Sequence, residues 1–352
     1  HPREECGVIG VYSPGQDASK IAFFGLFALQ HRGQESAGIA STTGKHISIH
    51  SGMGLISSIF REEELAPLSG SMAIGHTRYS TTGSSKPDNA QPFLVNGAHG
   101  AIALGHNGNL VNAAELQMAL AKNWGCSFTS STDSEAMAHL LANAPGTEWE
   151  ERISYAMRNF QGAFSAVVLT NDTLMGVRDP LGVRPLCIGK LNGDGWVIAS
   201  ESCALDHLGA TYLRELEPGE AVLITEKGLR SYVWPGSDGR RALCVFELIY
   251  FSRPDSILDS KLVYTARKAM GAQLAREHPT EADVVIGIPD SANAAAVGYA
   301  QESGIPYSEG LIKNRYVGRT FIEPDQRLRD LGVGLKFNPL PEVIDGKRVV
   351  VV

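Results

Sequence analysis

Short hydrophobic runs bounded by turn-forming residues dominate the first two thirds of the chain, and this pattern predicts a β-rich domain. Most runs are four to seven residues long and are flanked by Gly, Asn, Asp or Pro, which is typical of strands. The predicted strands are residues 7–12, 37–41, 46–50, 71–76, 100–104, 163–169, 173–177, 185–189, 196–199 and 220–225.

Helical periodicity is confined to a few grouped segments of this region. The predicted helices are residues 18–30, 112–123, 133–143 and 149–159. Asn112 and Asp133 are the predicted N-caps of two of these helices. Many strands in hairpin-like succession, with a few grouped helices, predict an α+β layered domain.

The pattern changes after a polar, turn-rich link at residues 235–243. Beyond this link, helices alternate with strands that are apolar throughout, which indicates a parallel sheet covered by helices. The predicted elements are a helix at 261–278, a strand at 283–288, a helix at 291–303 and a strand at 347–352. We therefore expect a domain boundary near residues 235–245.

Composition and charge exclude several classes of protein but do not indicate a function. The 352 residues are 43% hydrophobic and carry a formal net charge of −7, which argues against disorder and against bulk nucleic-acid binding. No apolar run approaches the ~20 residues that a membrane span needs. The five cysteines are odd in number and scattered, so reduced thiols in a cytoplasmic protein are expected rather than a disulfide framework.

Polar segments follow several of the predicted strands or begin a predicted helix, and functional residues often gather at such positions. These segments are 31–36 (HRGQES), 75–81 (GHTRYST), 105–110 (GHNGNL) and 131–135 (STDSE). Taken singly, each also fits an ordinary turn, a surface ion pair or a helix cap. Their combined order after the early Cys6-Gly7 pair favours a functional role over these structural ones.

Together, these segments resemble the glutamine amidotransferases that use an N-terminal cysteine nucleophile (class II). Three further motifs narrow the resemblance to the amidophosphoribosyltransferase family. They are 178–186 (RDPLGVRPL), 199–204 (ASESCA) and 250–256 (YFSRPDS). The resemblance runs from Cys6 to Val352. It implies an α+β N-terminal-nucleophile glutaminase domain with four αββα layers at 6–238, then an incomplete α/β type I phosphoribosyltransferase domain with a parallel sheet at 239–352.

The resemblance implies an enzyme that hydrolyses glutamine and passes ammonia to phosphoribosyl pyrophosphate, giving 5-phosphoribosylamine for purine biosynthesis. A thiol of pKa ~8.5 is only partly ionised at neutral pH, whereas a free α-amine of pKa ~7.7–8.0 on the same residue can act as its base. Cys6 then has to be the first residue. We expect residues 1–5 to be a propeptide that is removed after Glu5, with no glutaminase activity before cleavage.

The same resemblance assigns roles in the glutaminase half. It assigns the oxyanion of the tetrahedral intermediate to the Asn107 side chain and the Gly108 N–H, because preorganised donors stabilise that charge. It assigns the α-carboxylate of glutamine to Arg78 and the α-ammonium to Asp133. The further positions that the resemblance places around bound glutamine are Arg32, Gly33 and Thr81.

In the second half, the resemblance implies Mg²⁺ and a polyanionic substrate. Ser291 matches a position of the magnesium and diphosphate site. The basic segment after residue 312 resembles a loop that folds over phosphoribosyl pyrophosphate, with the candidate residues Lys313, Arg315, Tyr316 and Arg319. Cys244 matches one of four cysteine ligands of a [4Fe–4S] cluster in part of the family, with the other ligands outside this chain; a structural thiol is nearly as good an interpretation.

The resemblance also implies regulation and assembly. Purine nucleotides are the expected feedback inhibitors, and a homo-oligomer, commonly a tetramer, is the expected assembly. The acidic pair and phosphate loop of such transferases would follow Val352, so we expect this chain alone to be limited to the glutaminase half. No nucleic-acid or membrane partner is expected.

Three alternatives remain at this point. The acceptor domain of glucosamine-phosphate synthase or asparagine synthetase is disfavoured by the segments 253–256 (RPDS) and 313–320 (KNRYVGRT). A non-catalytic or regulatory paralogue is disfavoured by the intact set of candidate glutaminase residues. A self-cleaving hydrolase that acts on peptides is distinguished by whether the protein releases ammonia from glutamine.

Overall fold

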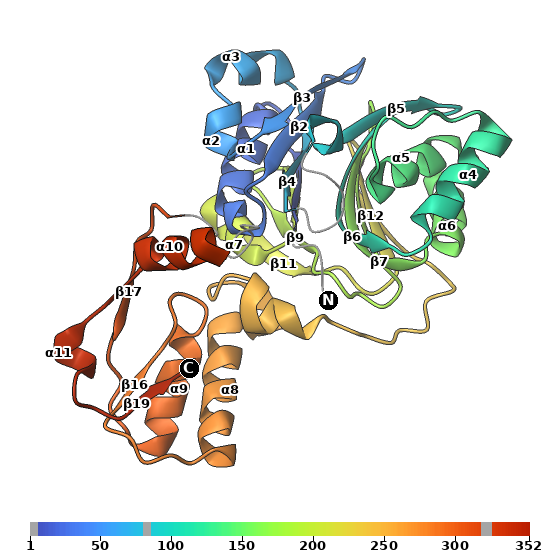
Figure 1. Cartoon of the computed structure of the whole chain (residues 1–352). Helices are drawn as coiled ribbons and strands as arrows, with labels where there is room; N and C mark the ends of the chain where they lie inside the picture. The colour runs from blue at the N-terminus through green and yellow to red at the C-terminus, as the bar shows by residue number, and fades with distance from the viewer. Residues whose placement is uncertain (1–5, 80–85, 318–325) are drawn as a thin grey trace. The chain divides into compact units, whose positions relative to one another are not determined.

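The computed structural model describes residues 6–79, 86–317 and 326–352 of the chain (Figure 1). The chain divides into two compact units, His1–Val245 and Phe246–Val352. The division lies shortly after the expected boundary at residue 238. Within the described ranges, no helix combines the length and apolarity needed to cross a lipid bilayer.

The first unit contains an antiparallel sheet of seven strands. In order across the sheet, these strands are β11 (Thr211–Glu215), β9 (Cys187–Lys190), β10 (Trp196–Ala199), β1 (Gly7–Tyr12), β4 (Met72–Arg78), β2 (Ser36–Thr42) and β3 (Ile47–Met53). Helices α1 (Ala18–Ala28) and α7 (Ser202–His207) pack on one face of it, with the short α2 (Ile56–Ile59). Apolar residues such as Ile9, Leu26 and Ala204 form the core between this sheet and its helices.

A second antiparallel sheet of six strands belongs to the same unit. Its strands, in order, are β13 (Gly228–Val233), β12 (Glu220–Thr225), β8 (Leu174–Arg178), β7 (Gly162–Leu169), β6 (Gly100–Leu110) and β5 (Phe93–Gly97). Helices α4 (Ala113–Trp124), α5 (Asp133–Asn143) and α6 (Trp149–Asn159) cover one face of this sheet (Figure 1). Their shared core includes Leu104, Met137 and Phe164.

A third apolar cluster lies between the two sheets. It contains Val8 and Ile74 from the first sheet and Ala103 and Val167 from the second. Strands β1 and β4 pack against β6 and β7 across this layer. The two sheets of the unit therefore pack against each other through this cluster, and the central strands of both sheets are buried on both faces.

The second unit contains the parallel pairing that the sequence predicts. Strand β16 (Val284–Ile286) pairs in parallel with β19 (Val349–Val351). Helices α8 (Val263–Glu277) and α9 (Asn293–Ser303) pack closely at Gly271 and Gly298, where a Cβ atom would overlap the backbone of the facing helix. The remaining elements are β14 (Ile257–Leu258), β15 (Lys261–Leu262), β17 (Leu311–Lys313), α10 (Gln326–Lys336), β18 (Phe337–Pro339) and α11 (Pro341–Ile344).

Two local predictions are wrong. Strand β6 does not end at residue 104 but continues to Leu110, because its polar half pairs with β7 as regularly as its apolar half does. Asp133 is not the N-cap of α5: Thr132 holds that position and Asp133 is the first helical residue. The Asp133 carboxylate instead accepts a hydrogen bond from the Leu110 N–H, at 2.8 Å.

Candidate active site

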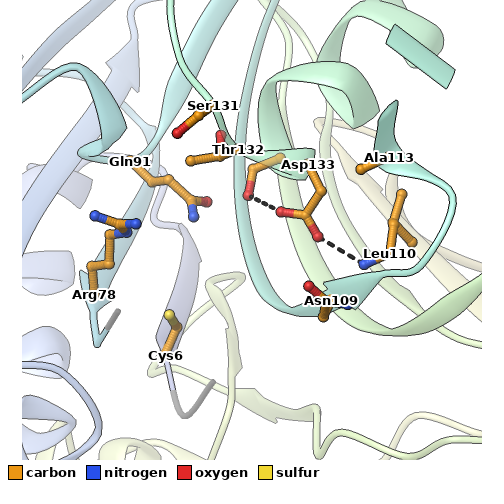
Figure 2. A pocket seen from close by; sticks show the side chains of 10 residues that line it. Cys6, Arg78, Gln91, Asn109, Leu110, Ala113, Ser131, Thr132 and Asp133 are labelled. Atoms are coloured by element: carbon orange, nitrogen blue, oxygen red, sulfur yellow. Dashed lines mark hydrogen bonds between the residues drawn. The ribbon is translucent and has the colours of Figure 1, made fainter. Parts of the chain in front are cut away.

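The ends of strands from both sheets meet at a cavity of about 190 Å³ in the first unit. Its lining residues are Cys6, Arg78, Gln91, Asn109, Leu110, Ala113, Ser131, Thr132, Asp133 and Ser134. Figure 2 shows the thiol of Cys6 and the guanidinium of Arg78 on one side, with Asn109 and Asp133 on the other. The cavity therefore combines a thiol, a cation and an anion from three of the segments that the sequence singles out.

Cys6 immediately precedes β1 and is 2% exposed. Its thiol donates a weak hydrogen bond to the Tyr79 carbonyl, with an Sγ–O distance of 3.9 Å. Because β1 is a central strand of its sheet, hydrogen-bonded to both β4 and β10, the backbone after Cys6 is held on both sides. The thiol is thus presented from a rigid strand rather than from a loop.

Arg78 ends β4, and its guanidinium is oriented by Glu35. Arg78 Nη1 donates to Glu35 Oε1 at 2.7 Å, and the Glu35 N–H donates to the Arg78 carbonyl at 3.0 Å. A guanidinium has five N–H donors, so this ion pair leaves donors for a second carboxylate. The sequence marked Arg78, whereas Glu35 was quoted only as part of its motif.

Asp133 is held at the cavity by the turn that precedes α5. Its Oδ1 lies 3.5 Å from Ser134 Oγ and 3.8 Å from His106 Nδ1. The buried Glu135 carboxylate accepts hydrogen bonds from the backbone and hydroxyl groups of Thr129 and Ser130. Burial opposes ionisation of Glu135, but these four donors outweigh it and hold the pKa of its carboxyl below the usual value.

Asn107 and Gly108 lie within β6 beside this cavity wall. The Asn107 side chain is fully buried, and neither its Oδ1 nor its Nδ2 has a hydrogen-bond partner among the described residues. Such groups are rare because an unsatisfied buried polar group costs about 1–3 kcal/mol. Gly108 has a φ of 141°, and a Cβ at this position would overlap the Ala163 carbonyl of β7.

Two buried histidines, His76 in β4 and His106 in β6, form hydrogen bonds beside the cavity. His76 Nε2 donates to the His106 carbonyl at 3.0 Å, and the His106 N–H donates to Gln91 Oε1 at 2.9 Å. Burial lowers the pKa of His76 to about 3 and also lowers the pKa of His106. Both rings are therefore neutral at physiological pH and position the backbone next to Asn107. Sequence reasoning assigned no role to Gln91, Asn109 or either histidine, although Asn109 and both histidines lie within segments that it quoted; Gln91 lies in none of them.

The resemblance placed Arg32 and Gly33 around bound glutamine. The Arg32 side chain is fully buried and does not belong to the cavity lining; its Nε donates to the Cys6 carbonyl at 3.1 Å. At Gly33, a Cβ would lie only 2.5–2.6 Å from the backbone of Thr77 and Arg78, so glycine allows this turn to pack against β4. Thr81 lies outside the described residues.

In the second unit, Ser291 lines a separate cavity of about 380 Å³ whose wall is largely apolar. The neighbouring Asp290 follows β16, and its carboxylate lies 2.5 Å from Lys313 Nζ. Arg315 is exposed, Tyr316 is fully exposed, and Arg319 lies outside the described residues. The structure thus places Lys313 in contact with Asp290, the residue that precedes Ser291.

Potential metal ligands are scattered in the part of the chain that the structure describes. Within the described ranges, no three or more His, Cys, Asp or Glu side chains are grouped so as to hold a metal ion. Cys244 is half-buried, and its backbone N–H donates to the Val183 carbonyl at 3.2 Å. A [4Fe–4S] cluster needs four thiolate ligands, and the described residues around Cys244 do not provide them.

The class of protein follows from a comparison with known families. Residues 76–207 match the family model described as a glutamine amidotransferase domain. This segment contains Arg78, Asn107, Gly108 and Asp133, so it covers both sides of the cavity apart from Cys6.

Relatives over the whole chain define the family. Amidophosphoribosyltransferase from Synechococcus elongatus is 50% identical over 100% of this chain and 72% of its own length. The Synechocystis enzyme of the same name is 52% identical with the same coverage. A solved structure of glutamine phosphoribosylpyrophosphate amidotransferase from B. subtilis, complexed with ADP and GMP, matches with a TM-score of 0.89 and 46% identity over 98% of this chain and 74% of that chain.

The chain belongs to the amidophosphoribosyltransferase family, as the resemblance predicted. It is an enzyme of glutamine-dependent amido transfer to phosphoribosyl pyrophosphate in purine biosynthesis. This excludes the acceptor domains of glucosamine-phosphate synthase and asparagine synthetase. These comparisons do not assign roles to individual residues.

Proposed function

We propose that the cavity at Cys6 is the glutaminase site and that Cys6 is its nucleophile. One observation carries this proposal: a single small cavity presents a thiol, the Arg78 cation and the Asp133 anion. Free glutamine carries an α-carboxylate, an α-ammonium group and a side-chain amide. The two charged side chains complement its two charged groups, which leaves the amide for the thiol.

The reaction that this arrangement supports has two stages. The free α-amine of Cys6 takes the thiol proton, and the thiolate attacks the amide carbon of glutamine. The oxyanion that forms accepts hydrogen bonds from Asn107 Nδ2 and the Gly108 N–H. The C–N bond then breaks, and the proton on the Cys6 amine moves to the departing nitrogen. Ammonia is released, and the glutamyl group stays bound to Cys6 as a thioester. Water hydrolyses the thioester to glutamate and restores the thiol.

This chemistry requires removal of residues 1–5. In the sequence as written, the nitrogen of Cys6 is bonded to Glu5 as an amide and has no basic lone pair. Cleavage between Glu5 and Cys6 would create the α-amine that the first proton transfer uses. We therefore assign 1–5 to a propeptide, 6–238 to the αββα glutaminase domain and 239–352 to the phosphoribosyltransferase portion.

Phosphoribosyl pyrophosphate is assigned to the second unit. Ser291 follows the carboxyl end of β16, where α/β sheets bind ligands, and Lys313, Arg315 and Tyr316 supply cationic and hydroxyl donors. Arg319 is assigned on sequence alone. Mg²⁺ keeps few protein ligands when a substrate supplies phosphate oxygens, so Ser291 and Asp290 fit it. When bound, Mg²⁺ would neutralise charge on the leaving pyrophosphate.

Regulation by purine nucleotides is supported by the relatives. The B. subtilis structure holds ADP and GMP, and a second solved structure with a TM-score of 0.90 is described as the allosteric regulatory enzyme of purine biosynthesis. We infer that purine nucleotides inhibit this protein as well, and that it acts as a homo-oligomer, a tetramer, in the cytoplasm.

Replacement of the nucleophile tests the glutaminase proposal. Cys6→Ala should abolish glutamate release from glutamine in processed protein, whereas Cys126→Ala, a half-buried thiol of the same unit outside the cavity lining, should retain it. Both variants should show the same midpoint of thermal unfolding, which controls for loss of the fold. Glutaminase activity that survives in Cys6→Ala would contradict the proposal, whereas processed wild-type protein without any glutaminase activity would favour the non-catalytic paralogue.

A further inference from the structure

A buried carboxylate behind the cavity connects to the backbone of Cys6. The side chain of Glu201 is fully buried at the N-cap position of α7, but it makes no capping hydrogen bond to that helix. Its Oε1 instead accepts hydrogen bonds from Arg32 Nη1 at 2.6 Å and from His31 Nε2 at 2.7 Å. The Cys203 thiol lies 3.7 Å from its Oε2.

Arg32 extends this connection to Cys6. Its guanidinium is fully buried, and Nε donates to the Cys6 carbonyl oxygen at 3.1 Å while Nη1 holds Glu201. The two opposite charges stabilise each other in the interior, so the loss of either one weakens the hold on the other. The guanidinium fork therefore fixes the Cys6 carbonyl relative to Glu201 through a single rigid group.

The residue before Glu201 holds the start of β1 as well. Ser200 Oγ accepts a hydrogen bond from the Val8 N–H at 2.9 Å, and the Ser200 N–H donates to the Val8 carbonyl at 3.0 Å. Ser200 and Glu201 thus restrain the residues on both sides of Gly7. Apart from Cys6 itself, none of these residues lines the cavity, so their contacts act on the position of Cys6 and not on bound glutamine directly.

We propose that Glu201 is a positioning residue of the glutaminase site: through Arg32 it fixes the Cys6 carbonyl, and with it the direction of the Cys6 thiol and α-amine. The inference rests on the proposed role of Cys6. A reacting group displaced by about 1 Å can lose about 100-fold in rate. Loss of Glu201 should therefore lower kcat and leave the binding of glutamine nearly unchanged.

The test compares Glu201→Gln with a matched variant of another buried carboxylate. Glu220 is 2% exposed and binds both terminal nitrogens of Arg214 at 2.7 Å, but it contacts neither Arg32 nor Cys6 among the described residues. In processed enzyme, Glu201→Gln should lower the glutaminase kcat at least about tenfold with KM for glutamine within about threefold. Glu220→Gln should leave both parameters within about twofold, although it also removes the charge of a buried carboxylate that is paired with an arginine.

Labelling by diazo-oxo-norleucine, a glutamine-mimicking electrophile, gives a readout that a purely structural role would not change. At saturating reagent, the rate of Cys6 alkylation should fall in Glu201→Gln in parallel with kcat, and Glu201→Asp, which keeps the carboxylate, should recover part of both. A folded Glu201→Gln variant with the kcat and alkylation rate of Glu220→Gln would overturn the proposal.

A second variant, Arg32→Lys, tests the proposal if Glu201→Gln does not fold. Arg32→Lys retains a cation beside Glu201, but a single ammonium group lacks the planar fork that joins the two acceptors. It should show the same loss of kcat, and an unchanged kcat would overturn the proposal. Cys6→Ala, measured in parallel, separates the two questions: activity that survives in it contradicts the role of Cys6, whereas a dead Cys6→Ala with fully active Arg32→Lys removes only the role of Glu201.

Discussion

Asn107 has a buried amide group whose polar atoms have no partner among the described residues. A folded protein keeps such a group at a cost of about 1–3 kcal/mol, so the side chain has a use outside folding. Its place next to Gly108, in a strand whose end lines the cavity, agrees with a donor to the oxyanion. The unpaired amide therefore supports the proposal that Asn107 donates to the oxyanion.

If Asn107 donates to the oxyanion, Asn107→Ala should strongly lower the glutaminase activity and hardly change the stability of the protein. The glutaminase kcat should fall about 10²–10³-fold, the usual effect of removing one oxyanion donor. The free energy of unfolding should change by less than about 1 kcal/mol, because relief of the unsatisfied amide offsets the lost packing. Steady-state kinetics and urea unfolding measure the two quantities.

Asn112 provides the opposite case. Its Nδ2 donates to the Asn159 carbonyl at 2.8 Å, and its Oδ1 accepts from the Gln161 N–H at 3.1 Å. Asn112→Ala should therefore destabilise the protein by about 1–2 kcal/mol and leave kcat unchanged. If Asn107→Ala destabilises as much as Asn112→Ala and keeps its activity, the assignment to the oxyanion is wrong.

Sequence motifs identified side chains of the cavity more readily than the groups that hold them. Cys6, Arg78 and Asp133 lie in recognisable segments, and the structure brings all three to one cavity. The resemblance placed Arg32 near bound glutamine, but in the structure its guanidinium donates to the Cys6 carbonyl and to Glu201. The contact from Arg32 to Glu201 spans 169 positions of sequence, and no local pattern predicts a pairing of that kind.

At the scale of elements, strand β6 depends on the glycine at position 108. Gly108 pairs with Phe164 of β7 at a φ of 141°, and a Cβ there would overlap the neighbouring carbonyl. Gly108→Ala should destabilise the protein by at least about 2 kcal/mol from backbone strain and overlap together. Gly100→Ala, in the same strand at a φ of 94° with no atom near its Cβ, should cost about 1 kcal/mol. Equal losses in thermal unfolding would contradict this.

The turn before α5 gives a pH dependence. Because hydrogen bonds from Thr129 and Ser130 lower the pKa of Glu135 below its usual 4.5, the unfolded chain binds a proton at that site more readily. The stabilisation is complete above the unfolded pKa and is lost as the pH falls through the lower folded pKa. Glu135→Gln should cost about 1–3 kcal/mol at pH 7, from weakened hydrogen bonds to a charged group.

Denaturant unfolding at several pH values checks the sign of this effect. The difference in unfolding free energy between wild type and Glu135→Gln should be constant above about pH 5 and should shrink as the pH is lowered further. A difference that grows on acidification would mean that the Glu135 carboxyl is protonated in the folded state.

The strands of the first unit that sequence patterns missed share a place in the fold. Strands β5, β11 and β13 were not predicted, and each lies at an edge of its sheet. Edge strands are half-exposed, so they lack the continuous apolar runs that marked the central strands. The prediction for β6 stopped at residue 104 for a related reason: the following residues are polar or glycine, yet residues 105–108 are buried by pairing with β7.

At the scale of the whole molecule, the two units correspond to the two halves of the family's reaction. The first unit contains the cavity that we propose as the glutaminase site, and the second contains the residues that we assign to phosphoribosyl pyrophosphate. In this proposal, the state of the Cys6 nitrogen determines whether glutamine can be hydrolysed. An amide nitrogen at Cys6 cannot accept the thiol proton, whereas an α-amine of pKa ~7.7–8.0 can.

Mass spectrometry of protein labelled with diazo-oxo-norleucine tests this claim most directly. The measurement determines, in one preparation with known glutaminase activity, both the first residue of each labelled chain and the site of the adduct. We expect the adduct on Cys6, only in chains that begin at Cys6, and activity in proportion to those chains. Full glutaminase activity, or an adduct on Cys6, in chains that still carry His1 through Glu5 would contradict the account.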